Sequence, residues 1–158
     1  MYKNILVPLD GSQLAECVLP HVESIAKGCG GKTVTFVRVV EPIQRPPASK
    51  GGYASPKTDI WERIESEFRA EAKNYLNQLM NRVKYEGVDV QSEVLTGGRA
   101  ADMIAEYATK SEVDLIIIAT HGRSGVSHWV WGSVADRILR SACVPVLMVR
   151  APGCVAGI

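Results

Sequence analysis

The chain has 158 residues, of which 46% are hydrophobic and 22% are charged, and its formal net charge is +1 at pH 7. This length suits one domain over residues 1–158, large enough to bury roughly two-thirds of its unfolded surface. A near-neutral chain lacks the basic balance of a nucleic-acid binder, and no apolar run approaches the roughly 20 residues of a membrane span, so we expect neither nucleic acid nor a membrane as a partner. The N-terminus leads into a strand pattern without a targeting signal, which favours a cytoplasmic location.

The first half of the chain reads as strand, helix, strand and loop. An apolar run at residues 2–8 predicts a strand, which ends at Pro8 and is followed by the turn signal DGS. Apolar positions at helical spacing over about residues 13–28 predict a helix, and the β-branched run at 33–40 predicts a second strand. The segment 41–57 holds four prolines, two glycines and no periodic pattern, which predicts a long, flexible loop.

The second half continues this alternation. The same criteria predict, in chain order, a helix at residues 59–85, a strand at 88–95, a helix at 100–110, a strand at 113–119, a helix at 132–141, a strand at 144–149 and a tail at 151–158. The run VDLIIIA at 113–119 is typical of a strand buried on both faces. Strands that alternate with helices form right-handed parallel crossovers, so we expect an α/β fold with one sheet covered by helices on both faces.

Two loops of this sheet have the composition of a ligand site. Ligands of such sheets bind beyond the carboxyl ends of the strands, where the strand order reverses. One loop follows the first strand and contains Asp10, and the other is the glycine-rich segment that follows the fourth strand and leads to Gly132 and Ser133. Glycines let backbone N–H groups approach an anion, and a helix start adds unpaired donors and a positive dipole end. If the first and fourth strands are neighbours, both loops face one crevice.

Each motif also has a purely structural interpretation. In that interpretation Asp10 is simply a turn residue, and Gly122 and Gly125 simply form a tight connection. The Gly132-Ser133 pair is then no more than a helix cap. We expect no catalytic residue, because no serine or cysteine nucleophile with a partner is evident near His121. We expect no metal ligand, because no two of the four cysteines have the spacing of a zinc or redox site. The chain also lacks the GxxxxGK[ST] phosphate loop, which leaves at most weak ATP hydrolysis.

Taken together, the motifs resemble the universal stress protein family, in its single-domain, UspA-like, ATP-binding form. The resemblance is carried by KNILVPLDGS at residues 3–12, THGRSG at 120–125, GSVA at 132–135 and VPVLMV at 144–149. It covers nearly the whole chain, and the loop at 41–57 is its least typical part. It implies an open five-stranded parallel sheet, Rossmann-like or adenine nucleotide alpha hydrolase-like, in strand order 3-2-1-4-5. It further implies a stress-response or signalling module that binds ATP with little or no turnover.

The glycine pattern of the ATP-binding members is present here with one departure. That pattern is GxxG, nine residues, then Gly-Ser or Gly-Thr. Gly122 is followed by nine residues and then by Gly132 and Ser133, but Ala119 takes the place of the first glycine. An added methyl group can crowd a backbone that must approach a phosphate, but alanine is the smallest alternative to glycine, and the rest of the pattern is intact.

The resemblance also assigns roles to individual residues. Asp10 would bond the ribose hydroxyls or flank the base, and Pro8 and Leu9 would line that side. Val39 would meet the adenine through its backbone, and Gly98 would lie near the nucleotide. The residues assigned to the phosphates are Ala119, Gly122, Arg123, Gly132, Ser133 and Val134. A cation, Mg²⁺ or Mn²⁺, would be held through the phosphates and water, since no carboxylate cluster is visible.

The last strand, at residues 144–149, is short and apolar, and we expect it at an edge of the sheet. An apolar edge strand is a pairing hazard unless it is covered. The resemblance implies that a second copy covers it, which makes a homodimer. The residues leave a second function open, namely a nucleotide-free structural or protein-interaction module of the same fold.

Overall fold

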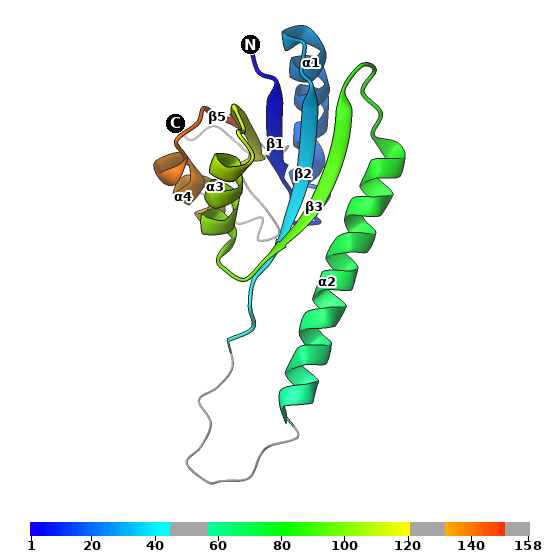
Figure 1. Ribbon diagram of the computed structural model, residues 1–158, viewed down its shortest axis with the longest axis vertical. Coiled ribbons are helices and arrows are strands. Elements are labelled where there is room, and N and C mark those ends of the chain that lie inside the picture. Colours follow the sequence, from blue (N-terminus) through cyan, green and yellow to red (C-terminus); the bar gives the residue numbers. More distant parts are fainter. Residues whose placement is uncertain (45–56, 121–131, 151–158) are drawn as a thin grey trace, which may run out of the picture.

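The computed structural model describes residues 1–44, 57–120 and 132–150, with the backbone alone at 57–59. In chain order its elements are β1 (Asn4–Pro8), the 3-10 helix η1 (Ala15–Val18), α1 (Leu19–Cys29), β2 (Thr33–Val40), α2 (Lys57–Arg82), β3 (Asp89–Thr96), α3 (Ala100–Lys110), β4 (Leu115–Ala119), α4 (Ser133–Ser141) and β5 (Val146–Val149). Within the described residues, five strands form one parallel sheet in the order β3-β2-β1-β4-β5 (Figure 1). The expected fold class and strand order are confirmed.

The centre of the sheet is apolar on both sides. All five residues of β4 are buried, as are the last four of β1, because helices cover both faces of these central parallel strands. β1 lies between β2 and β4, and it pairs with β4 at Ile5 and Leu115. The chain therefore moves from β1 through β2 to β3 on one side and then crosses to β4 on the other. The strand order reverses between β1 and β4, where this class of sheet binds its ligands.

The alternation of side chains along β1 divides the core into two clusters. Ile5 and Val7 belong to the cluster on the face of α1 and α2, where Phe36 and Leu79 are fully buried. Leu6 belongs to the cluster on the opposite face, beneath α3 and α4. Successive residues of a strand point to opposite faces, so one short apolar strand supplies both layers. Figure 1 shows the two pairs of helices on either side of the sheet.

The predicted helix at residues 13–28 is wrong in its first turn. The chain forms η1 there, and the α-helix begins only at Leu19, with Pro20 in its first turn. A proline in the first turn of a helix removes a donor that has no intrahelical partner. α1 ends at Cys29, and its C-cap Gly30 has φ +66° and a backbone N–H that donates to Ala26 O. That left-handed conformation favours glycine, so the predicted stop is confirmed to within two residues.

The predicted helix at residues 59–85 begins and ends earlier than expected. α2 begins at Lys57 and ends at Arg82, and its exposed apolar residues include Ile60 (55% exposed) and Phe68 (46%). Val83 and Tyr85 continue the apolar pattern past the end of the helix because both are buried against the α1/α2 cluster. Burial outside the helix thus mimicked helical periodicity.

Parts of two other predictions lie outside the described residues. Of the predicted loop at 41–57, residues 45–56 are not described, and its last residue belongs to α2. The predicted tail at 151–158 also lies outside the description. Among the helices that the structure does describe, none combines the length and apolar character needed to cross a membrane.

Candidate functional site

The candidate site lies where β1 and β4 leave the sheet. The two strands are neighbours, so the loops that follow Pro8 and Ala119 begin side by side at the carboxyl edge. Pro8 is buried, and the N–H of Leu9 donates to Val37 O at 2.9 Å, which extends the pairing of β1 and β2 by one residue. Asp10, the next residue, is half-buried. The observed strand order therefore places the starts of both loops at the same edge of the sheet.

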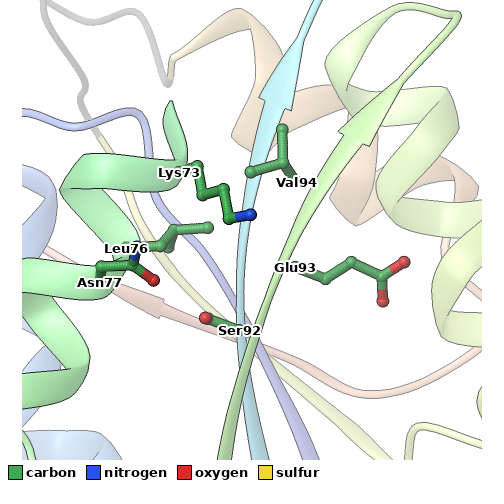
Figure 2. A pocket seen from close by; sticks show the side chains of 6 residues that line it. All are labelled: Lys73, Leu76, Asn77, Ser92, Glu93 and Val94. Carbon is green, nitrogen blue, oxygen red and sulfur yellow. The ribbon is translucent and has the colours of Figure 1, made fainter. Parts of the chain in front are cut away.

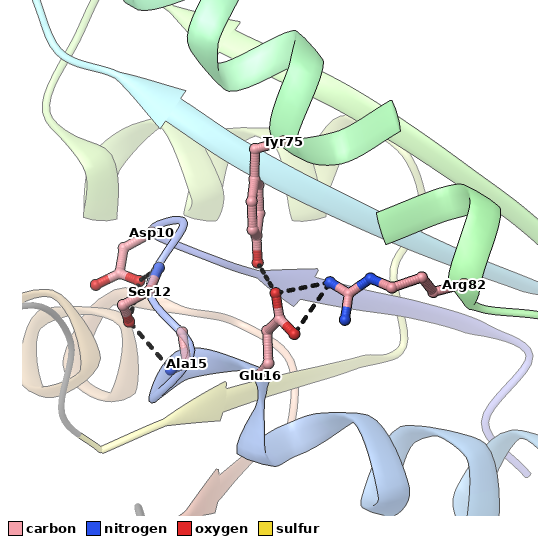
Figure 3. Close-up of polar contacts among 6 residues, drawn as sticks. All are labelled: Asp10, Ser12, Ala15, Glu16, Tyr75 and Arg82. Atoms are coloured by element: carbon pink, nitrogen blue, oxygen red, sulfur yellow. Dashed lines mark hydrogen bonds and ion pairs between the residues drawn. The ribbon is translucent and has the colours of Figure 1, made fainter. Parts of the chain in front are cut away.

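Asp10 shapes the β1 loop through one carboxylate oxygen. Its Oδ1 accepts hydrogen bonds from the N–H of Ser12 (2.9 Å) and from Ser12 Oγ (2.7 Å), and Ser12 Oγ in turn accepts one from the N–H of Ala15 (3.1 Å) (Figure 3). Gly11 has φ +86°, a conformation that L side chains rarely adopt. Asp10 thus serves as a turn residue. A carboxylate offers about four acceptor sites, so a turn and a ligand role are compatible.

A polar cluster connects α2 to this loop. Tyr75 Oη donates to Glu16 Oε1 at 3.1 Å, and Arg82 Nη2 donates to both Glu16 oxygens at 3.0 and 3.1 Å (Figure 3). Burial and the Glu16 carboxylate raise the pKa of Tyr75 well above its ordinary value, so its hydroxyl keeps its proton. The Arg38 guanidinium lies 5.5 Å from the centroid of the Tyr75 ring and donates to Glu71 Oε1 at 3.0 Å.

Sequence reasoning did not single out this cluster. Tyr75 reads only as part of the apolar stripe of a helix, and Glu16 reads as an ordinary charge. Arg38 carries the one usable signal, since it interrupts the β-branched run TVTFVRVV. A charge in a buried strand is rarely tolerated without a partner, and Arg38 is only 8% exposed.

The exits of β2 and β3 hold the next two predicted residues. Val39 is half-buried near the end of β2, and Gly98 lies between β3 and α3. A Cβ on Gly98 would lie 2.9 Å from Met103 Sδ, a contact that a shift of this flexible side chain can relieve, so packing alone does not require glycine there. The N–H of Ala100 donates to Glu41 Oε1 at 2.7 Å, which places a carboxylate from the chain itself on the N-terminus of α3.

The exit of β4 holds most of the residues assigned to the phosphates. Thr120 N–H donates to Val149 O at 2.9 Å, and Gly132 N–H donates to Thr120 O at 2.7 Å. Gly132 is the N-cap of α4, and it provides no side-chain cap for the helix. The N–H groups of Ser133 and Val134 belong to the first turn of α4, where backbone donors have no intrahelical partner. The predicted residues Gly122 and Arg123 lie outside the described part of the chain.

The methyl group of Ala119 is buried in the core. This residue is 7% exposed and belongs to the cluster on the α1/α2 face, together with Leu9 and Ala15. α4 packs on the opposite face of the sheet. The side chain that departs from the glycine pattern therefore points away from the start of α4.

Two other features bear on the chemistry of the chain. Among the described residues, no group of three or more His, Cys, Asp or Glu side chains could hold a metal ion.

A groove of about 260 Å³ runs between α2 and the edge strand β3, lined by Lys73, Leu76, Asn77, Ser92, Glu93 and Val94. Figure 2 shows Lys73 and Asn77 on the α2 side of this groove, with Glu93 pointing away from α2. The groove is two strands away from the switch point and is not part of the candidate site.

Comparison with known proteins gives consistent relatives. A family model described as the universal stress protein family matches residues 1–150. Universal stress protein MJ0531 of Methanocaldococcus jannaschii is 31% identical over 153 residues, which cover 96% of this chain and 84% of that protein. The structure of the hypothetical protein MJ0577, from the same organism, aligns with a TM-score of 0.74 at 25% identity, over 97% of this chain and 99% of that one.

Two more distant structures with the same fold contain nucleotides. One is a universal stress protein in complex with cAMP, with a TM-score of 0.57 at 18% identity over 95% of this chain and 98% of that one. The other is the Arabidopsis thaliana family protein At3g01520 with AMP bound, with a TM-score of 0.61 at 17% identity over 96% of this chain and 93% of that one.

Proposed function

The chain belongs to the universal stress protein family, and we propose that it binds an adenine nucleotide, ATP above all, at the exits of β1, β2 and β4. In this proposal it is a cytoplasmic stress-response or signalling module with little or no turnover of the nucleotide. The fold, the position of the switch point and the adenine nucleotides of two distant relatives support this proposal.

One observation carries the proposal. The Asp10 turn follows β1, and the start of α4 is bonded to Thr120 at the end of the neighbouring strand β4, at the point where the strand order reverses. An anionic acceptor and a helix N-terminus suit the two ends of a nucleotide, because ribose hydroxyls donate hydrogen bonds and phosphates accept them.

The residues divide the nucleotide between them. Asp10 would accept the ribose hydroxyls, with Pro8 and Leu9 beside it, and Val39 would meet the adenine through its backbone. Gly98 would lie near the nucleotide. Ala119, Gly122, Arg123, Gly132, Ser133 and Val134 would surround the phosphates. The start of α4 fits such an anion because its N-cap, Gly132, adds no side chain of its own. Mg²⁺ or Mn²⁺ would be bound through the phosphates and water and would neutralise part of their charge.

Calorimetry tests the binding itself. Titration of the purified chain with ATP and Mg²⁺ should give a dissociation constant on the order of micromolar. AMP should bind more weakly, because it lacks the β- and γ-phosphates that the start of α4 would hold. GTP is the control for recognition of the base. No heat with ATP, together with no displacement of a fluorescent ATP analogue at millimolar ATP, would contradict the proposal.

Replacement of Asp10 tests the ribose contact. Asp10→Asn keeps an acceptor oxygen for the Ser12 turn but removes the charge, and charge-assisted hydrogen bonds are about twice as strong as neutral ones. We expect ATP affinity to fall about tenfold, with the fold unchanged by circular dichroism. Asp102→Asn, an exposed change on α3, is the matched control and should bind ATP as the parent does. Equal affinities for both variants would remove Asp10 from the site.

The nucleotide-free interaction module remains the second candidate, and one observation favours it. The N–H of Gly132 is already bonded to Thr120 O, so this donor is not aimed at an anion. For this second candidate, the bond between Gly132 and Thr120 simply connects the end of β4 to the start of α4 and binds no anion. The same titration separates the two functions, because a nucleotide-free module gives no heat with any adenine nucleotide.

A further inference from the structure

We propose that Tyr75 of α2 is a positioning residue for the nucleotide site, because it joins the loop that follows β1 to the end of β2. The inference rests on the proposed function and extends it to a residue that neither the glycine pattern nor the family resemblance marks. Tyr75 would not touch the nucleotide. It would hold the two segments on either side of it at a fixed spacing.

The first connection runs through Glu16. Tyr75 Oη donates to Glu16 Oε1, and Arg82 holds both oxygens of the same carboxylate. Glu16 is in η1, directly after Ala15, whose N–H donates to Ser12 Oγ and thereby reaches the Asp10 turn. Figure 3 shows this sequence of contacts from α2 to Asp10. Two hydrogen bonds, Tyr75 to Glu16 and Ala15 to Ser12, therefore connect α2 to the β1 loop.

The second connection runs through Arg38. Its guanidinium stacks on the Tyr75 ring at 5.5 Å and pairs with Glu71 of the same helix. The Arg38 side chain is only 9% exposed, and a cation over an aromatic ring is bound more strongly when water is excluded. Arg38 directly precedes Val39, whose backbone is the expected adenine contact. Tyr75 thus contacts Glu16, which follows the Asp10 turn, and Arg38, which precedes the expected adenine contact.

The geometry matters because a ligand that spans two segments needs both in register. Binding groups are productive only when they are held within about 0.5 Å of their bound positions. A tyrosine hydroxyl is protonated at physiological pH and can donate this bond, and burial and Glu16 raise the pKa of Tyr75 further. Without this bond the β1 loop would sample other conformations, and the apparent affinity would fall by the fraction that stays competent.

The test compares two tyrosines. Tyr75→Phe removes the hydroxyl and keeps the ring for Arg38, and we expect ATP to bind about fivefold more weakly, the effect of one net hydrogen bond. Tyr85→Phe is the matched control, because it removes another buried tyrosine hydroxyl, which donates at 3.4 Å to Leu19 O at the start of α1 and makes no bond to Glu16 or to the Asp10 turn. It should leave ATP affinity unchanged even if it lowers stability.

A ligand lacking the ribose hydroxyls separates positioning from general loosening. Because Asp10 would contact those hydroxyls, Tyr75→Phe should weaken ATP but leave the affinity of 2′,3′-dideoxy-ATP as in the parent chain. Glu16→Ala should repeat the loss, and the double variant with Tyr75→Phe should lose no more than the larger single effect. Equal losses for ATP and dideoxy-ATP, or equal losses for both tyrosine variants, would overturn the proposal.

Amide hydrogen exchange keeps the test independent of the proposed function. Tyr75→Phe should speed exchange at Ser12 and Ala15, the two N–H groups that hold the β1 loop, and Tyr85→Phe should not. If the parent chain binds no adenine nucleotide, the proposed function fails while faster exchange still supports Tyr75 as the residue that holds the loop. Unchanged exchange would overturn the positioning role whatever the parent chain binds.

Discussion

Ala119 shows how the direction of one side chain changes the meaning of a motif. By sequence alone its methyl group threatens the approach of a phosphate. In the fold the methyl group is part of the α1/α2 cluster, while α4 starts on the other side of the sheet. Because side chains alternate along β4, the methyl group of Ala119 lies on the opposite face of the sheet from α4, whose start is the expected phosphate site.

This placement gives a prediction for Ala119→Gly. ATP affinity should be retained or improved, because no group that faces α4 is removed. Stability should fall by about 1 kcal/mol, because the change deletes a buried methyl group and adds backbone freedom within a strand. Urea unfolding and calorimetry measure the two effects separately. A clear loss of affinity at unchanged stability would mean that the Ala119 side chain contacts the ligand.

At the scale of elements, the sequence predicted what depends on local periodicity and missed what depends on distant contacts. β2 and α3 lie within one residue of their expected bounds, since their apolar patterns are terminated by turns. The break between η1 and α1 and the early end of α2 were not foreseen. Val83 and Tyr85 kept the helical pattern because the core buries them in a non-helical connection. Likewise, Tyr75 and Glu16 are 59 residues apart, and no local pattern indicates that they meet.

The connection after α2 has a predicted response to alkali. Burial, and to a smaller extent Glu23, raise the pKa of Tyr85 from 10.0 to about 12. A raised folded pKa means that the stabilisation is complete below pH 10 and is lost as pH rises from 10 towards 12, by about 2–3 kcal/mol in all. Tyr85→Phe cannot ionise and should make this part of the profile shallower, while Tyr75, whose pKa is also raised, keeps part of the loss in both chains. Denaturant unfolding between pH 8 and 12 measures it, and parallel profiles for the two chains would contradict the assignment.

On the scale of the whole molecule, the sheet explains why a candidate site could be proposed from the sequence. Alternating strands and helices predict a parallel sheet, and the resemblance supplied the order that makes β1 and β4 neighbours. The place of the candidate site follows from that order alone. The supports of the site, Arg38 and Tyr75, come from β2 and α2, and only the packing of α2 on the sheet brings them together.

The two edges of the sheet differ in a way that predicts how copies associate. β3 exposes Asp89, Gln91 and Glu93, and charged side chains on an edge strand discourage pairing. β5 instead offers the half-buried apolar residues Val146 and Met148. We therefore predict a homodimer in which two β5 strands pair antiparallel about a twofold axis, within the segment 144–149.

Disruption of β5 tests this assembly. Light scattering at tens of micromolar protein should give about twice the chain mass of 17.2 kDa. Val146→Asp with Met148→Asp should give monomers, because two buried charges at a symmetric interface are doubled by the second copy. Val90→Asp with Val94→Asp is the matched control, since these half-buried valines lie on the other edge strand and also pack on a core cluster. Both variants lose comparable apolar packing, so a loss of the dimer in the β5 variant alone locates the interface. A parent chain of monomer mass, or a folded β5 variant that stays dimeric, would place the interface elsewhere or remove it.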